Sequence, residues 1–241
     1  IGAYFNTYYN AKRLFTEAED EIRTQQLTNI KVGPQSFRAP FAIQTGTRTK
    51  LTSVIEKCSK LLQYHPESDL VDDALLMIGK AYYYQDENQK AERKFKELLD
   101  RYPQSDLLPE TKLLLSQVYY RMSDLTAAMN TAKELLEDAQ KDGNDDMVAR
   151  AATVLGNIEL DNKNYPQSIS YFQAAAERWS NAEERASAQI KVAEVCQMEG
   201  KFAKAADAYR LAQQSGGSYL TEYRSRIGEA PVFRVTRFAR I

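Results

Sequence analysis

The sequence predicts an all-α fold, a right-handed α-solenoid of about four full helix–turn–helix repeats with partial repeats before them and an extended C-terminal tail. Two observations predict it. The pattern L-L-x-x-x-P-x-S-D occurs at residues 61–69 and again at 98–106, which places Pro66 and Pro103 37 residues apart. Apolar residues also recur at helical spacing in paired blocks, and a small residue marks each pair. Helical hairpins stacked at a regular period explain both observations.

The elements before the first full repeat are less regular. Apolar residues at Ala11, Phe15 and Ala18 match the pattern of the second helix of a hairpin, and Val54, Cys58 and Leu61 match it again. Between them, residues 28–47 contain two prolines and two glycines, which regular helix does not tolerate. We therefore expect residues 1–217 to form the solenoid, with an irregular insertion at about 28–47 that is long for a loop between repeats.

The first full repeat follows Pro66. Its first helix carries Leu75, Ile78 and Tyr82, a turn is predicted at 85–88, and its second helix carries Ala91, Phe95 and Leu98. Gly79 occupies the small-residue position, where a short side chain allows two helices to approach closely. The same position holds Ser116, Gly156 and Ala193 in the next three repeats, at intervals of 37, 40 and 37 residues. The core positions of those repeats are Leu115, Tyr119, Ala128, Ala132 and Leu135; Leu155, Phe172 and Ala175; and Val192, Cys196, Ala205, Tyr209 and Ala212.

Residues 218–241 form the last element, for which we expect a short helix and then an extended basic tail. From Tyr219 onward there are five arginines and two glutamates, and Pro231 interrupts the helical pattern. Because the apolar pattern has not ended at Ile241, we expect this tail to lead into a further region.

The spacing of the apolar, small, aromatic and proline positions from Asp69 to Ser215 resembles that of the tetratricopeptide repeat (TPR). This resemblance implies a non-enzymatic scaffold that binds other proteins. The L-x-x-x-x-P-x-S-D turns and the aromatic first segment further resemble bacterial outer-membrane assembly lipoproteins of the BamD type. That likeness implies a periplasmic, outer-membrane location, a lipid-modified cysteine upstream of Ile1, and an envelope protein or β-barrel as partner. The alternative is a soluble cytoplasmic TPR adaptor that binds a peptide or helix in its concave groove.

Composition argues against several other functions. Lys and Arg number 32 against 33 Asp and Glu, whereas a general nucleic-acid binder shows a clear basic excess. One His and two Cys offer little to catalysis or to a metal, so we expect no enzyme activity, cofactor or metal site. The chain has no run of 18 apolar residues, so membrane association would depend on a lipid anchor. The oligomeric state is left open.

The candidate binding residues lie on the first helices, which line the concave groove in the TPR pattern. Tyr and Arg are enriched among the residues that dominate binding at interfaces. We predict a groove centred on Tyr83, Tyr120 and Arg121; the alternative is ordinary helix surface, or a surface covered by the N-terminal segment. Tyr82, Tyr119 and Tyr209 are assigned to the core, Cys58 and Cys196 to buried core positions, and His65 to surface packing. The full set of candidate partner-binding residues is Lys80, Tyr83, Tyr84, Gln117, Tyr120, Arg121 and Asn157, with Arg234 and Arg237 in the basic tail.

Overall fold

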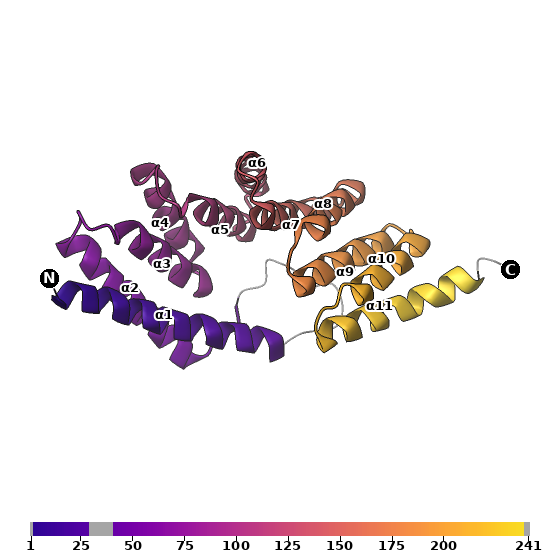
Figure 1. Cartoon of the computed structure of the whole chain (residues 1–241), viewed down its shortest axis with the longest axis horizontal. Coiled ribbons are helices and arrows are strands. Elements are labelled where there is room, and N and C mark those ends of the chain that lie inside the picture. The colour runs from indigo at the N-terminus through magenta and orange to yellow at the C-terminus, as the bar shows by residue number, and fades with distance from the viewer. Residues whose placement is uncertain (1, 29–40, 239–241) are drawn as a thin grey trace. The chain divides into compact units, whose positions relative to one another are not determined.

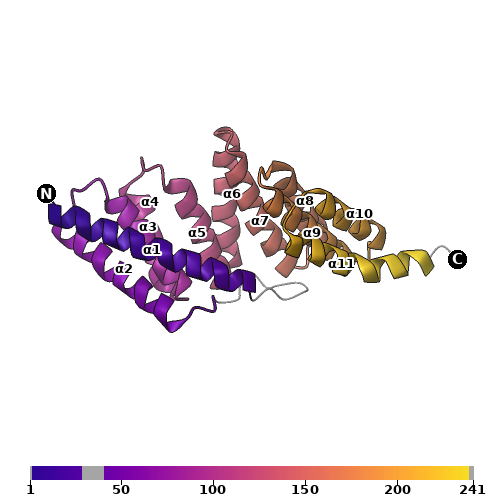
Figure 2. The same cartoon turned by 60° about the horizontal axis from the view of Figure 1, so that its bottom comes forward.

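The computed structural model describes residues 2–28 and 41–238, with side chains for 6–26 and 41–232. These residues form eleven helices and no strand, which confirms the predicted all-α fold (Figures 1 and 2). Within the same residues, no helix is both long and apolar enough to cross a membrane. The helices are α1 (Gly2–Thr28), α2 (Thr45–Tyr64), α3 (Val71–Tyr84), α4 (Asn88–Arg101), α5 (Leu108–Arg121), α6 (Leu125–Lys141), α7 (Asp145–Asp161), α8 (Tyr165–Arg178), α9 (Ala182–Met198), α10 (Phe202–Gln214) and α11 (Tyr219–Phe238).

The helices are grouped into two compact units that divide within α6, between Ala128 and Met129. In the first unit α1 packs on α2 and α3 on α4, while α2 contacts α3 and α4 contacts α5. In the second unit α7 packs on α8, α9 on α10, and α11 on both α10 and α9. First helices of successive hairpins are also in contact: α1 contacts α3, and α3 contacts α5. Each unit is therefore the stack of hairpins that the repeat predicts.

The small-residue position allows the two helices of a hairpin to approach closely, as predicted. A Cβ atom added to Gly79 would lie 2.4 Å from Cε1 of Phe95, and one added to Gly156 would lie 2.8 Å from Cε1 of Phe172. In both hairpins an aromatic ring of the second helix rests directly on the backbone of the first. Ser116 and Ala193, the other small residues in this position, are fully buried.

The turns inside the four hairpins that begin with α3, α5, α7 and α9 share one geometry. After α3, the N–H of Asp86 donates to the carbonyl of Tyr83 at 3.2 Å and that of Glu87 to the carbonyl of Tyr82 at 2.9 Å. This pair of bonds is a Schellman motif, which needs one residue in the left-handed region. The same two bonds recur after α5, α7 and α9. The left-handed residues are Asp86 (φ 63°), Ser123 (φ 65°), Lys163 (φ 59°) and Gly200 (φ 78°).

The two P-x-S-D segments form matching turns between hairpins. The hydroxyl oxygens of Ser68 and Ser105 each accept the backbone N–H two residues later, at 3.2 Å in both turns. The Ser105 hydroxyl also donates to Oδ2 of Asp72 at 2.6 Å, which joins the second turn to the start of α3. The repeated sequence thus fixes a repeated connection between hairpins.

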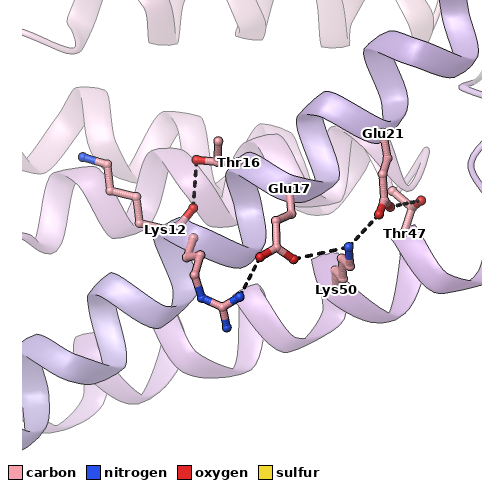
Figure 3. Close-up of polar contacts among 7 residues, drawn as sticks. Lys12, Thr16, Glu17, Glu21, Thr47 and Lys50 are labelled. Carbon is pink, nitrogen blue, oxygen red and sulfur yellow. Dashed lines mark hydrogen bonds and ion pairs between the residues drawn. The ribbon is translucent and has the colours of Figure 1, made fainter.

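Helix α1 takes the place of a first helix, not the second-helix place that Ala11, Phe15 and Ala18 indicated. It is a single helix of 27 residues that packs along α2 and contacts α3 (Figure 1). Figure 3 shows how polar contacts join α1 to α2: Lys50 Nζ lies 2.6 Å from Glu21 and 3.3 Å from Glu17. The Thr47 hydroxyl donates to Glu21 at 2.7 Å. Hydrogen bonds from Lys50 and Thr47 lower the pKa of Glu21, so this carboxylate stays charged.

Residues 219–238 form helix α11, so the predicted short helix is present, but the extended tail expected after residue 226 is helical as far as Phe238, with Pro231 inside the helix. Packing within the second unit explains the difference. Gly228 lies so close to Tyr209 that an added Cβ would be 2.4 Å from the phenol ring, and Val232 is buried. Gln197 Nε2 also donates to the Gly228 carbonyl at 3.0 Å. Of the predicted insertion at 28–47, residues 29–40 lie outside the described residues, and α2 already begins at Thr45.

The close approach at Gly79 yields a test of the fold. We expect Gly79→Ala to lower the free energy of unfolding by about 1–3 kcal/mol, because the new methyl overpacks against the Phe95 ring. Combining it with Phe95→Leu should cost less than the sum of the two single changes, since the shorter side chain makes room. Chemical denaturation followed by circular dichroism measures all three variants.

Gly46→Ala is the matched control. Gly46 also lies in a helix but has no neighbouring atom within 4 Å of an added Cβ. It should leave stability unchanged or raise it slightly, by up to about 1 kcal/mol. Equal effects of the two alanine substitutions would contradict the close packing of α3 on α4.

Candidate functional site

Most of the predicted residues of the first two full repeats lie together on one face of the first unit, formed by α3 and α5. The hydroxyl of Tyr83 on α3 donates to Oε1 of Gln117 on α5 at 3.1 Å. Arg121, at the end of α5, places Nη1 3.4 Å from the carbonyl of Tyr83. The helical repeat brings these side chains together because first helices of successive hairpins lie next to each other.

The Arg121 guanidinium contacts two aromatic rings that meet edge to face. Its guanidinium carbon is 4.2 Å from the centre of the Tyr83 ring and 4.2 Å from that of the Phe41 ring. Its side chain is only 5% exposed, and Asp86 Oδ1 lies 3.9 Å away. A cation held against aromatic faces is stabilised by about 0.5–1 kcal/mol in water and by about 2 or more when desolvated. The near-complete burial of Arg121 places it in the stronger class.

Phe41 completes an aromatic cluster on this face. Its ring centre is 5.4 Å from that of Tyr83 and 5.1 Å from that of Tyr84, edge to face in both pairs. Edge-to-face pairs at these separations add about 0.5–1.5 kcal/mol beyond the area they bury. We call Phe41, Tyr83, Tyr84 and Arg121 the Phe41 cluster.

An ionic network borders the Phe41 cluster. Lys80 on α3 pairs with Glu19 on α1 at 2.8 Å and with Glu110 on α5 at 3.2 Å, and its ammonium lies 5.2 Å from the Phe15 ring centre. The Tyr84 hydroxyl donates to Glu19 at 2.8 Å. Burial alone would lower the pKa of Lys80, but Glu110 and Glu19 outweigh it and raise that pKa. Lys80 therefore remains charged and ties three first helices together.

The two phenols on this face are neutral hydrogen-bonding groups. Burial raises the pKa of Tyr83, and burial together with the Glu19 carboxylate raises that of Tyr84, so both phenols stay protonated at neutral pH. Within the residues described, no group of three His, Cys, Asp or Glu side chains is placed to hold a metal ion. The groups on this face are aromatic rings, the Arg121 guanidinium, and the amide of Gln117 and phenols of Tyr83 and Tyr84, which form hydrogen bonds.

The structure corrects the predicted exposure of the groove centre. Tyr83 is 5% exposed and Tyr120 is 2% exposed, so neither is open helix surface. Tyr82 and Tyr119, assigned to the core, are partly buried and pack against the core of the first unit, with Lys90 and Lys96 over their rings. The position of Phe41, which precedes α2, agrees with the alternative that the N-terminal segment covers this face.

The other predicted residues are placed as follows. Asn157 is in the second unit on α7, buried, with Nδ2 donating to the carbonyl of Thr153 at 2.7 Å. Arg234 and Arg237 belong to α11, and their side chains lie outside the described residues. Cys58 and Cys196 are buried as predicted, and burial raises the pKa of the Cys58 thiol to about 12. His65 is exposed in the turn after α2.

Sequence reasoning missed Phe41, Glu19 and Glu110. Phe41 lies in the predicted insertion, whose unusual length was the available signal. Glu19 and Glu110 occupy helix surface positions with no pattern of their own, and only the approach of α1, α3 and α5 gives them a shared partner in Lys80.

The ionic network yields a test. We expect Lys80→Met to lower the free energy of unfolding by about 1–3 kcal/mol, because it leaves two partly buried carboxylates next to each other without a cation. Lys80→Arg should retain most of the stability. Thermal or urea denaturation measures both.

Lys90→Met is the control, since Lys90 pairs with Glu87 on the exposed surface of the same unit. It should leave the denaturation midpoint unchanged. If Lys80→Met behaves in the same way, the network does not hold the three helices together.

Comparison with known proteins supports the repeat. The tetratricopeptide repeat family matches residues 73–105 and residues 147–214. No curated protein matches the chain.

Three solved structures illustrate the similarity of fold. BtubC (BKLC) from P. vanneervenii is 15% identical, with 89% of this chain and 91% of that one covered and a TM-score of 0.61. A tetratricopeptide repeat protein from Parabacteroides merdae is 14% identical, with coverages of 96% and 76% and a TM-score of 0.59. A Rap protein complexed with Competence and Sporulation Factor is 14% identical, with coverages of 88% and 64% and a TM-score of 0.50. At these identities the likeness concerns the fold, and with the two matched segments it shows that this chain contains tetratricopeptide repeats.

Proposed function

We propose that this chain is a non-enzymatic scaffold for protein–protein interaction and that the α3–α5 face of its first unit binds a segment of a partner protein. The observation that carries the proposal is the Phe41 cluster. It combines a buried arginine and a buried tyrosine with a half-buried rim that includes Phe41, Tyr84 and Gln117. Protein interfaces are commonly anchored by aromatic and arginine side chains, the residue types that gather here.

For the place of action, we propose the bacterial envelope, with the chain on the periplasmic side of the outer membrane. The support is the resemblance of the turns at 61–69 and 98–106 to BamD-type assembly lipoproteins. A partner there would be an envelope protein, such as a β-barrel, and a lipid anchor would supply the membrane attachment.

The second candidate is a cytoplasmic adaptor that binds a peptide or a helix on the same face. The Rap protein of similar fold, whose structure contains Competence and Sporulation Factor, favours this alternative. The two candidates share the binding chemistry and differ in compartment.

Affinity purification from separated membrane and soluble fractions, followed by mass spectrometry, tests both candidates. We expect proteins of the outer membrane to be captured from the membrane fraction, and Gln117→Ala to reduce their recovery about fivefold or more by removing the bond to Tyr83. Arg93→Ala, an exposed position on the second helix α4, is the matched control and should leave recovery unchanged. Specific partners found only in the soluble fraction would favour the adaptor.

Equal recovery with Gln117→Ala and Arg93→Ala would place the binding surface elsewhere on the chain. The absence of any specific partner from both fractions would contradict the scaffold function itself.

A further inference from the structure

Phe41 belongs to a segment that is not part of any repeat. Residues 41–44 are not helical and precede α2, yet the Phe41 ring lies on side chains of α3 and α5. The other residues of the Phe41 cluster come from repeat helices. An aromatic side chain from outside the repeat therefore covers the face on which the repeat places its own rings.

The backbone hydrogen bonds that this segment makes with other described residues are local. The N–H of Ile43 donates to the Phe41 carbonyl and that of Arg48 to the Gln44 carbonyl, both at 3.0 Å. The side chains of Phe41 and Ile43 are partly buried against the core of the first unit. Side-chain contacts thus hold Phe41 on α3 and α5.

The contacts around Phe41 are best made by an aromatic ring. If Phe41 left, the Arg121 guanidinium would lose a ring contact, and Tyr83 and Tyr84 would each lose an edge-to-face neighbour. An aliphatic side chain would fill the space without restoring the cation–π contact. Both cations near the site already have carboxylate partners, Arg121 with Asp86 and Lys80 with Glu19 and Glu110, so an acidic side chain is not needed to balance them. A neutral aromatic side chain therefore fits it best.

We propose that Phe41 is an internal substitute for an aromatic side chain of the partner polypeptide, and that the two compete for the same place on Tyr83, Tyr84 and Arg121. The partner segment carries a Phe, Tyr or Trp as its anchor. This proposal rests on the proposed function and specifies both the partner's chemistry and a reason why the unbound protein covers its own binding face.

Short peptides added to the full chain provide the test. The probe is the N-acetylated, C-amidated peptide with the sequence of residues 41–46, made with Phe, Tyr, Trp, Leu or Ala at its first position. Tethered groups compete at effective concentrations on the order of millimolar, so the wild-type chain should bind the Phe peptide at least tenfold more weakly than Phe41→Ala does. Binding is followed by NMR chemical-shift titration of the labelled protein.

With Phe41→Ala, the three aromatic peptides should bind at least tenfold more tightly than the Leu and Ala peptides. Ile43→Ala is the matched control, because it removes an apolar contact of the same segment and keeps the Phe41 ring. It should bind peptide no better than wild type. Circular dichroism checks that each variant is folded, and if Phe41→Ala is not, Phe41→Leu should give the same order of peptides.

Three results would overturn the proposal: equal binding to wild type and Phe41→Ala, no preference for aromatic peptides, or no binding to either Phe41 variant. Because the probe is synthetic, these results are independent of whether a native partner is found. A native partner recovered equally well with wild type and Phe41→Ala would leave the scaffold function intact and contradict the competition alone.

Discussion

The close approach of paired helices is the constraint on which the rest of this structure depends. Phe95 and Phe172 lie on bare backbone at Gly79 and Gly156, where even a methyl group would collide with the ring. Tyr209 lies on Gly228 in the same manner, although these two residues come from α10 and the following α11. Such contacts fix the rotation and depth of one helix on the next, because closely packed interiors leave little freedom for either to shift. The rotation in turn decides which side chains of a first helix face its neighbours.

This constraint also explains why so much of each first helix is buried. Helix α3 packs against α2 and α4 and touches α1 and α5, so every residue from Ala74 to Gly79 is buried, as are Ala81 and Tyr83. Polar groups on such a helix need partners. Lys80 finds Glu19 and Glu110, and Tyr83 finds Gln117, each across a helix–helix contact. The site is thus a consequence of the stacking, since its polar bonds join helices that the apolar contacts have already brought together.

The sequence was sufficient to predict the repeat, the small-residue position and the first-helix location of most site residues. The small-residue position could be predicted because it depends on a contact within one hairpin, which recurs at the repeat period. It is occupied by Gly79, Ser116, Gly156 and Ala193. Exposure along α3 and α5 could not be read from periodicity, because a helix buried over most of its circumference has no clear polar stripe. The continuation of the last helix past residue 226 was missed because burial of Val232 and the close contact at Gly228 outweigh the local preference of Pro231 against helix. The position of Phe41 depends on contacts between distant segments, about which residue spacing gives no information.

The abundance of tyrosine, 15 residues against one histidine, follows from the same stacking. A phenol presents a large flat surface to a neighbouring helix and still ends in a hydroxyl that can bond across the contact. Tyr83 bonds to Gln117, Tyr84 to Glu19 and Tyr209 to Gln197, so this use of tyrosine occurs in both units. The α3–α5 face differs from the Tyr209–Gln197 contact of the second unit in two ways. Arg121 contacts its rings, and one of those rings, Phe41, comes from outside the repeat. Under the proposed function the tyrosines that pack α3 against α5 also belong to the face that a partner meets, so residue type alone does not separate packing from recognition.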